Sequence, residues 1–540
     1  MLACQSPQKK AEVIYTNASI WTGVPNAPRA QAMAIGNGEI LAVGSAEEIT
    51  AWRGATTRVV DLAGKFVVPG FVDNHTHFMS GGFQLASVDL RGAQSPEEFA
   101  QRLAAFAQKL PAGRWITGGD WDHETWGGEL PRRDWIDKFT PDHPVFVNRL
   151  DGHMALANSK ALALAGIDRH TPDPEGGTIV REAKTGEPTG ILKDEAMSPV
   201  YRVIPAPTAA EHDEALARAM AHAAALGVTQ VHDMGSYGWT DLETYRRAHA
   251  NGALSLRIYS FVPLATWPRL AEFVQANGRG EAWLRWGGLK GFVDGSLGST
   301  TAWFYQPYND APATSGLLTT DTTALRRWIL AADSAGLQVA VHAIGDQAND
   351  WLLDVYAQAL AQNGSRDRRF RIEHAQHLTR AAIPRFAELG VIPSMQPYHA
   401  IDDGRWAEKR IGPERIKTTY AFRSLLDSNA PLTFGSDWTV APISPLWGIY
   451  AAVTRRTLDG AHPDGWVPEE EISVEEALRC YTAGNAYAGF QENAAGILAA
   501  KRLADFVVLS EDLLALDPVR IPEVEVLRTV VGGRESFVKQ

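Results

Sequence analysis

Short hydrophobic runs alternate with longer amphipathic stretches through the central part of the chain. The runs read as buried strands, and the stretches between most of them repeat their apolar residues with helical spacing. The predicted helices include Thr322–Ala335, Asp350–Gln362 and Arg380–Leu389. The predicted strands are Val68–Asp73, Pro144–Arg149, Thr229–His232, Gly288–Val293, Gln338–His342, Phe370–His374, Val391–Met395 and Pro431–Gly435.

This alternation predicts the fold class. Eight strands separated by helices over about 370 residues are typical of an α/β protein with a (β/α)8 TIM barrel. The barrel is expected over residues 68–495, with insertions at about 113–142 and 154–207. Both insertions exceed ordinary loop length, so they are expected to form a lid or a pocket wall.

The two ends of the chain show a second pattern. Residues 12–67 and 496–540 read as short strands, many with β-branched residues, and Asn-Gly and Ala-Gly turns divide the N-terminal ones. We therefore predict a small β-sandwich domain formed from both termini. Residues 1–11 are expected to be an N-terminal tail.

Composition narrows the possible partners. The net charge of −12 argues against nucleic acid or an anionic membrane surface, because both attract basic proteins. Seventeen tryptophans are consistent with core filling and with aromatic-lined pockets. The two cysteines, Cys4 and Cys480, lie too far apart in the sequence to suggest a disulfide framework or a cysteine-rich zinc site. No apolar run reaches the roughly 18 residues that a membrane helix needs.

The N-terminus leaves localisation open between two alternatives. The segment "MLACQSPQKK" has small residues leading into Cys4, as at the end of a bacterial lipoprotein signal, but it lacks the apolar segment of such a signal. A trimmed signal would make the protein periplasmic or lipid-anchored, and an ordinary start would make it cytoplasmic.

Histidines and one aspartate follow several predicted strands. His75 and His77 end the first run two residues apart, so their side chains point the same way along a strand. About 0.4 such pairs are expected by chance among fifteen histidines, so the pair alone is a weak signal. His342, His374 and Asp437 end later runs, and active sites of barrels lie at these strand ends. Each has an ordinary structural interpretation, but together they predict a metal site of nitrogen and oxygen ligands.

These residues stand in motifs that resemble a known family. "PGFVDNHTH" (Pro69–His77), followed by two single histidines and Ser-Asp, is similar to the amidohydrolase superfamily of metal-dependent hydrolases. The match to its YtcJ-like branch (amidohydrolase family 3), which includes N-substituted formamide deformylase, is close. The further motifs are "GGDWD" (Gly118–Asp122), "DGHMALANSKAL" (Asp151–Leu162), "PEGGTI" (Pro174–Ile179), "DGSLGSTTA" (Asp294–Ala302), "VHAIGD" (Val341–Asp346), "RIEHAQ" (Arg371–Gln376) and "FGSDW" (Phe434–Trp438).

The resemblance implies a set of metal ligands. His75, His77 and Asp437 would bind one metal ion, and His342 and His374 would bind a second. Zn(2+) is the favoured ion, with Mn, Fe and Co as alternatives. Lys290 within the fourth strand could bridge two ions as N-carboxylysine, with Lys193 as a second candidate; if neither is carboxylated, one ion is expected.

The resemblance also implies a reaction. A metal-activated water would attack an amide-type, non-peptide C–N bond of a small molecule, with Asp437 as the proton carrier. His374 or His153 could donate a hydrogen bond to the developing oxyanion. The alternatives are a deaminase or an ester, lactone or phosphotriester hydrolase on the same barrel, and a catalytically silent barrel that binds a ligand.

Further residues are expected at the mouth of the barrel. His153, His377 and His399 have pocket and structural interpretations of similar weight. Asp294 ends the fourth predicted strand, where an aspartate is often only the N-cap of the next helix. A homodimer is expected, since such barrels commonly dimerise. The predicted substrate contacts are Trp121, Asp122, Arg149, His153, His399 and Trp438.

Overall fold

The computed structural model describes residues 10–149, 154–174, 177–298 and 300–540. It divides into two compact units. The barrel unit consists of Met1–Met79 and Leu216–Gln540, and the inserted unit is Ser80–Ala215. The predictions for Cys4 and His153 fall outside the described residues.

Eight parallel strands form the central sheet of the barrel unit, in the order β8-β14-β15-β16-β17-β18-β19-β20. Two backbone hydrogen bonds bring the last strand back to the first, from Asp437 N–H to His75 C=O and from His77 N–H to Trp438 C=O. The predicted (β/α)8 barrel is therefore confirmed. The strands are β8 Phe71–Thr76, β14 Val228–Asp233, β15 Arg257–Pro263, β16 Leu284–Phe292, β17 Gln338–Ala343, β18 Arg371–His374, β19 Ile392–Met395 and β20 Thr433–Phe434.

One strand prediction was wrong. Pro144–Arg149 is not the second barrel strand, because it forms β10 (Val145–Arg149) in the sheet of the inserted unit. The strand missed by the sequence is β15, Arg257–Pro263, which pairs with β14 and β16. Both segments are short, mainly apolar runs, and such a run does not reveal which sheet it will join.

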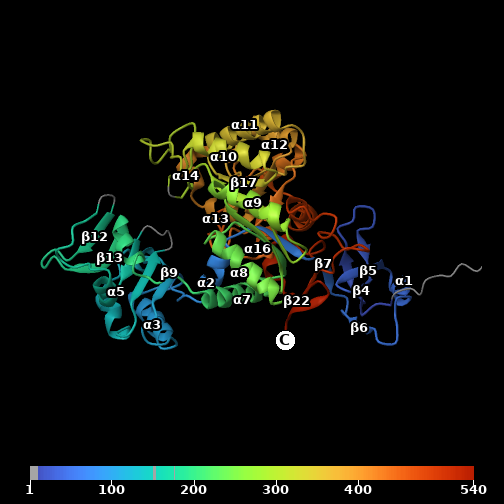
Figure 1. Cartoon of the computed structure of the whole chain (residues 1–540), viewed down its shortest axis with the longest axis horizontal. Coiled ribbons are helices and arrows are strands. Elements are labelled where there is room, and N and C mark those ends of the chain that lie inside the picture. The colour runs from blue at the N-terminus through green and yellow to red at the C-terminus, as the bar shows by residue number, and fades with distance from the viewer. Residues whose placement is uncertain (1–9, 150–153, 175–176, 299) are drawn as a thin grey trace, which may run out of the picture. The chain divides into compact units, whose positions relative to one another are not determined.

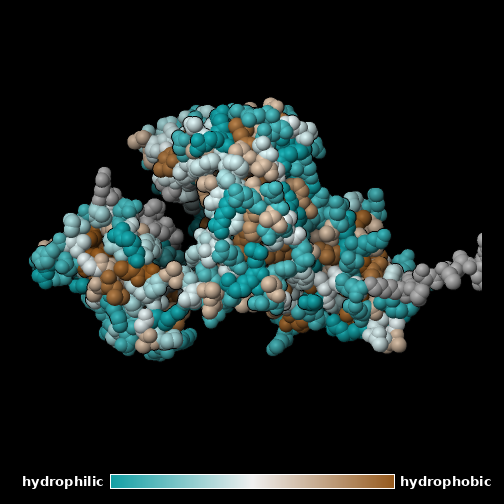
Figure 2. Space-filling model, viewed as in Figure 1, coloured by the Kyte–Doolittle hydropathy of each residue, from teal (hydrophilic) through white to brown (hydrophobic). Residues whose placement is uncertain are grey.

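The barrel helices are amphipathic and several are capped as their sequences suggest. In α10 (Thr322–Ser334), Asp321 accepts from the Ala324 N–H at the N-terminus, and the buried residues recur with helical spacing. The capping box at Ser473 is present at the start of α17 (Val474–Arg479). Figure 1 shows α10 near its neighbours beside β17, and their outer faces are mainly hydrophilic in Figure 2. The other long helices are α7 Ala209–Ala225, α8 Trp239–Ala250, α9 Trp267–Asn277, α11 Asp346–Asn363, α12 Ala382–Leu389 and α16 Pro445–Thr454.

A β-sandwich adjoins the barrel within the same unit. One sheet has the order β5-β4-β1-β6 and the other β23-β22-β21-β7-β2-β3, so strands from both termini meet in the second sheet. Tyr15, Met33 and Phe506 are fully buried between them, which confirms the predicted sandwich. The strands are β1 Val13–Thr16, β2 Ser19–Trp21, β3 Arg29–Ala30, β4 Ala32–Gly36, β5 Glu39–Gly44, β6 Arg58–Asp61, β7 Phe66–Pro69, β21 Phe506–Leu509, β22 Val526–Val531 and β23 Arg534–Val538.

The inserted unit has its own sheet and core. Its strands follow the order β12-β13-β11-β10-β9, with α3 (Pro96–Ala107) and α5 (Ser159–Leu164) among its helices. Both stretches that the sequence indicated as insertions belong to this one unit. Its remaining strands are β9 Ile116–Trp121, β11 Met154–Ala157, β12 Gly177–Arg181 and β13 Pro188–Asp194. In the described part of the whole chain, no helix has the length and apolar character needed to span a bilayer.

Candidate metal centre

The carboxyl ends of the barrel strands bring together the six residues that the sequence singled out as ligands. His75 and His77 lie at and just after the end of β8, and Asp437 follows β20. The rings of His75 and His374 lie 4.9 Å apart between centroids, and those of His342 and His374 lie 4.6 Å apart. Lys290 of β16 lies with its Nζ 3.3 Å from His75 Nε2.

Three of these residues form the tightest group. Ligand atoms of His75, His374 and Asp437 all lie within 4.8 Å of one another, and all three residues are buried. Asp437 Oδ1 lies 3.5 Å from His75 Nε2 and 3.4 Å from His77 Nε2. The grouping differs from the expected division, in which His374 joined His342 at a second ion.

The chemistry of this group fits a cation. Asp437 Oδ1 is buried and accepts no hydrogen bond within the described ranges. An unsatisfied buried acceptor is costly, and a metal ion bound between the carboxylate and two imidazoles would satisfy it. Two imidazole nitrogens and one carboxylate oxygen form a donor set that suits Zn(2+) and similar ions.

Hydrogen bonds set the orientation of three imidazoles. His75 Nδ1 lies 2.6 Å from Glu373 Oε2, and His374 Nδ1 lies 2.7 Å from Gln396 Oε1. His342 Nε2 lies 3.0 Å from the Gly295 carbonyl. Each of these oxygens accepts, so the facing nitrogen carries the proton and the opposite nitrogen is left as a potential ligand atom.

Burial holds these imidazoles in the neutral form that binds metals. It lowers the pKa of His77 to about 4 and that of His342 to about 3, with the Lys290 charge as a second cause. It lowers the pKa values of His75 and His374 well below the ordinary range. Because a metal replaces a proton on its ligand, imidazoles that resist protonation are suited to the task.

Burial raises the pKa of the carboxylate and lowers that of the lysine, so it favours the neutral form of both groups. It raises the pKa of Asp437 to about 7, against the lowering effect of Lys290. It also lowers the pKa of the Lys290 ammonium. A cation bound nearby would therefore favour the charged form of Asp437, and carboxylation of Lys290 would replace its positive charge by a negative one.

The backbone is strained at two of the three grouped residues. His374 has φ +74° and Asp437 has φ +60°, in the left-handed region that residues other than glycine rarely adopt. Such conformations cost about 1–3 kcal/mol each and persist where surrounding structure enforces them. At His374 the strain breaks the alternation of a strand, so that Glu373 and His374 both face His75.

The other predicted residues of the barrel unit have definite positions. The rings of His399 and His374 are nearly parallel with centroids 6.4 Å apart, and His399 Nε2 is buried with no hydrogen-bond partner in the described part of the chain. Trp438 packs against Phe78 and His222. His377 is held by a 2.8 Å contact between its Nδ1 and Thr419 Oγ1.

Asp294 has a structural role in the loop between β17 and α11. It accepts from the backbone N–H groups of Ile344, Gly345 and Trp303. Its Oδ1 lies 3.5 Å from His342 Nε2. These bonds fix the segment that carries His342.

The remaining predicted residues belong to the inserted unit. Trp121 is fully buried in its core and its indole N–H donates to the Val147 carbonyl at 2.8 Å, so its side chain serves packing and is not a proposed substrate contact. Arg149 pairs with Asp122 at 3.1 Å between Nη2 and Oδ1. Lys193 lies on β13, outside the barrel sheet.

Sequence reasoning missed two residues that touch the imidazoles, Glu373 and Gln396. Both are fully buried polar residues, and each is bonded to an Nδ1 atom. Glu373 lies inside "RIEH", two residues after Arg371, and this alternation of charged residues on a barrel strand is the signal that could have pointed to it. Gln396 carries no comparable signal.

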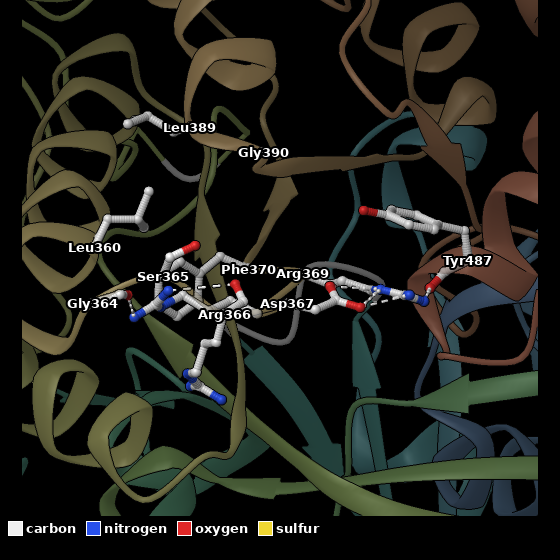
Figure 3. A pocket seen from close by; sticks show the side chains of 11 residues that line it. Leu360, Gly364, Ser365, Arg366, Asp367, Arg369, Phe370, Leu389, Gly390 and Tyr487 are labelled. Carbon is white, nitrogen blue, oxygen red and sulfur yellow. Dashed lines mark hydrogen bonds and ion pairs between the residues drawn. The ribbon is translucent and has the colours of Figure 1, made fainter.

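One described pocket lies away from this site. A pocket of about 390 Å³ is lined by residues 364–370, which precede β18, together with Leu360, Leu389, Gly390 and Tyr487 (Figure 3). Arg369 lies against the ring of Tyr487, 4.1 Å from its centroid. The pocket therefore opens at the amino ends of the strands, and its volume does not mark the metal centre.

Comparisons with known proteins give a consistent result. The family described as "Amidohydrolase family" matches residues 58–537. Protein LONG AFTER FAR-RED 3 of Arabidopsis thaliana is 44% identical over 541 residues, covering 98% of this chain and 92% of the relative. Putative amidohydrolase YtcJ of Bacillus subtilis is 33% identical, with coverage of 98% and 100%. N-substituted formamide deformylase of Arthrobacter pascens is 29% identical, with coverage of 97% for both chains.

A solved structure agrees with the fold. The crystal structure of an uncharacterized metal-dependent hydrolase from Pyrococcus horikoshii matches with a TM-score of 0.79 at 31% identity. The match covers 94% of this chain and 99% of that one.

Proposed function

This chain belongs to the amidohydrolase family, as its motifs indicated, and on that premise we propose that it hydrolyses a non-peptide, amide-type C–N bond of a small molecule with a metal ion at His75, His374 and Asp437. The observation that carries the proposal is the convergence of these three buried ligand groups at the mouth of the barrel, with Asp437 Oδ1 left without a hydrogen bond in the described structure.

His77 and His342 extend the proposed centre. Each lies beside the tight group, and each has one ring nitrogen committed to a backbone carbonyl. We propose Zn(2+) as the ion, with Mn, Fe or Co as alternatives. If Lys290 is carboxylated, it would join His342 and His77 to form a place for a second ion. When bound, such an ion lowers the pKa of a water molecule and polarises a substrate carbonyl.

Asp437 is the proposed proton carrier of the reaction. Its carboxylate lies next to His75 and His77 at the mouth, where it can accept a proton from attacking water and deliver it to the leaving nitrogen. Burial raises its pKa to about 7, and a bound cation would lower that pKa by favouring the carboxylate form, which accepts the proton.

His399 is the better placed of two histidines to act on the substrate. His374 cannot serve both as ligand and as hydrogen-bond donor to the substrate, because its Nδ1 is bonded to Gln396 and its other nitrogen faces the metal group. His399 Nε2 is buried and unbonded among the described residues. We propose that His399 contacts the substrate oxygen and that Trp438 also contacts the substrate; Asp122, Arg149 and His153 stay predictions from the sequence.

The choice of a C–N bond rests on the relatives. N-substituted formamide deformylase aligns over nearly the whole of both chains, and its name describes hydrolysis of an amide. A silent ligand-binding barrel is the second candidate, because the relative with 44% identity bears a name that is not that of an enzyme.

A screen of matched amides and esters tests the proposed function. The purified protein, loaded with Zn(2+) or Mn(2+), is expected to hydrolyse N-substituted amides faster than the corresponding esters. Turnover of esters or of ring amines without amides would replace the proposal by an esterase or deaminase. A metal-loaded protein that turns over no probe would support the silent barrel.

A further inference from the structure

Glu373 is a fully buried carboxylate behind the metal group. Its Oε2 accepts from His75 Nδ1 at 2.6 Å, from Ser394 Oγ at 2.6 Å and from Arg371 Nη2 at 2.9 Å. Its Oε1 accepts from Arg371 Nε at 2.7 Å. Four donors from three barrel strands thus fill the acceptor capacity of one carboxylate.

The guanidinium of Arg371 compensates the buried charge of Glu373. It also donates to the Asn74 carbonyl at 2.6 Å and lies 3.0 Å from His232 Nδ1. Glu373 is thereby bound on the side away from the ligand atoms, and it is not part of the group formed by His75, His374 and Asp437. Among the described residues of the metal group, its side chain hydrogen-bonds to His75.

The strained backbone at His374 is what makes this contact compatible with the metal group. On a regular strand, Glu373 and His374 would point to opposite faces. The left-handed φ of His374 turns its ring toward His75, whose Nδ1 is already bonded to Glu373. Two neighbouring residues of β18 therefore act on the same imidazole from two sides.

We propose that Glu373 is a positioning residue that sets the metal affinity of the site. It keeps the proton of His75 on Nδ1, so that Nε2 is bare toward the metal group, and its negative charge makes the ring a stronger ligand. The proposal rests on the proposed function, since it requires that His75 bind a metal.

Glu373→Gln is the sharpest substitution. Glutamine has one acceptor oxygen in place of two and brings its own N–H donors, so it cannot accept from His75, Ser394 and both Arg371 nitrogens. We expect the amide N–H to face His75 and to move its proton to Nε2. Loss of such a partner typically weakens metal binding 10–100-fold, so a decrease of about that size is expected.

Glu470→Gln is the matched control. Glu470 is also a buried glutamate that accepts from a serine hydroxyl, Ser424, but it lies in a 3-10 helix (Pro468–Glu470) and touches none of the metal group. The measurements are Zn(2+) affinity of the metal-free proteins by competition with a chelator, and their unfolding temperatures without metal. A purely structural role would lower the unfolding temperature and leave the affinity of the folded protein unchanged.

The outcomes separate this inference from the proposed function. Wild-type protein that binds none of the zinc, manganese, iron and cobalt ions would contradict the function itself. Tight wild-type binding with unchanged affinity in folded Glu373→Gln would overturn the role of Glu373 alone. If that variant does not fold, Glu373→Asp keeps the charge opposite Arg371 but is too short to reach both Arg371 and His75. It is expected to bind Zn(2+) at least 10-fold more weakly, and wild-type affinity would overturn the inference.

Discussion

The two ends of the barrel use similar residues in opposite ways. At the amino ends, buried charges are paired: Arg257 makes a two-pronged contact with Asp505 at 2.6 and 2.9 Å, and Arg368 Nε lies 2.9 Å from Asp333. At the carboxyl ends, Asp437 has an unsatisfied oxygen and left-handed backbone, in the described structure, next to neutral imidazoles. The first arrangement stabilises the fold, and the second leaves binding capacity for a ligand.

The difference shows why cavity volume is a poor guide here. The pocket at the amino ends is lined by arginines whose charges already have partners, among them Arg369 with Glu492. The carboxyl ends hold Asp437 Oδ1 and His399 Nε2, which are buried without a hydrogen-bond partner in the described structure, and three residues with left-handed backbone, His374, Ala375 and Asp437. Buried ligand atoms without hydrogen-bond partners, rather than pocket volume, identify the end of the barrel that we propose to be functional.

Removing Asp437 is expected to have the largest effect. Asp437→Ala takes away both a metal ligand and the proton carrier, so kcat/KM on the best amide substrate should fall by at least about 100-fold. The fold should be retained, because Oδ1 of the carboxylate that is removed makes no hydrogen bond within the described structure. Near wild-type turnover would remove Asp437 from the mechanism, and His75→Ala provides an independent check.

Breaking a pair at the amino end should produce the reverse pattern. Arg257→Ala leaves Asp505 buried without its partner, which typically costs about 3–5 kcal/mol of unfolding free energy. Denaturant unfolding and Zn(2+) titration of the folded variant check this prediction. Loss of metal affinity with unchanged stability would show that the two ends are not separated in function.

Metal removal should lower both the stability and the activity of the protein, because the proposed ion binds at the carboxyl ends of the strands. An ion present at 100 times its dissociation constant stabilises the folded state by about 2.7 kcal/mol. Chelation is therefore expected to abolish turnover and lower the unfolding temperature, and added Zn(2+) should restore both. The same treatment of Asp437→Ala should change its unfolding temperature much less, and an equal shift would place the stabilising ion elsewhere.

The smallest effect is expected at an ion pair outside both ends. Arg385 Nη2 lies 2.6 Å from Asp354 Oδ1, as close as the buried pair, but Asp354 is largely exposed. Arg385→Ala should change the unfolding free energy by less than about 1 kcal/mol. A loss as large as that of Arg257→Ala would mean that distance, rather than burial, decides the strength of these pairs.

Much of the fold followed from the sequence because it depends on local periodicity. The alternation of strands and helices predicted the barrel, and polar residues at strand ends pointed to His75, His342, His374 and Asp437 as neighbours. The confusion of β10 with β15 shows the limit, since both are short apolar runs and only tertiary pairing assigns them to different sheets.

The contacts behind the site could not be read in the same way. The bond between His75 and Glu373 joins residues 298 positions apart, and no local pattern encodes it. The left-handed φ of His374 likewise has no signal in its residue type, because it is imposed by packing around the strand end. Trp121 shows the converse, since a motif residue near a strand end is buried in the core of the inserted unit.

Anomalous diffraction from crystals of the Zn(2+)-loaded protein tests the central claim most directly. The account predicts an anomalous peak at the zinc edge within bonding distance, about 2.0–2.2 Å, of His75, His374 and Asp437. A second peak near His342 would indicate a second ion, and electron density for a carboxyl group on Lys290 Nζ would show the carboxylated lysine. A zinc-loaded crystal with no peak at these residues would contradict the proposed metal centre.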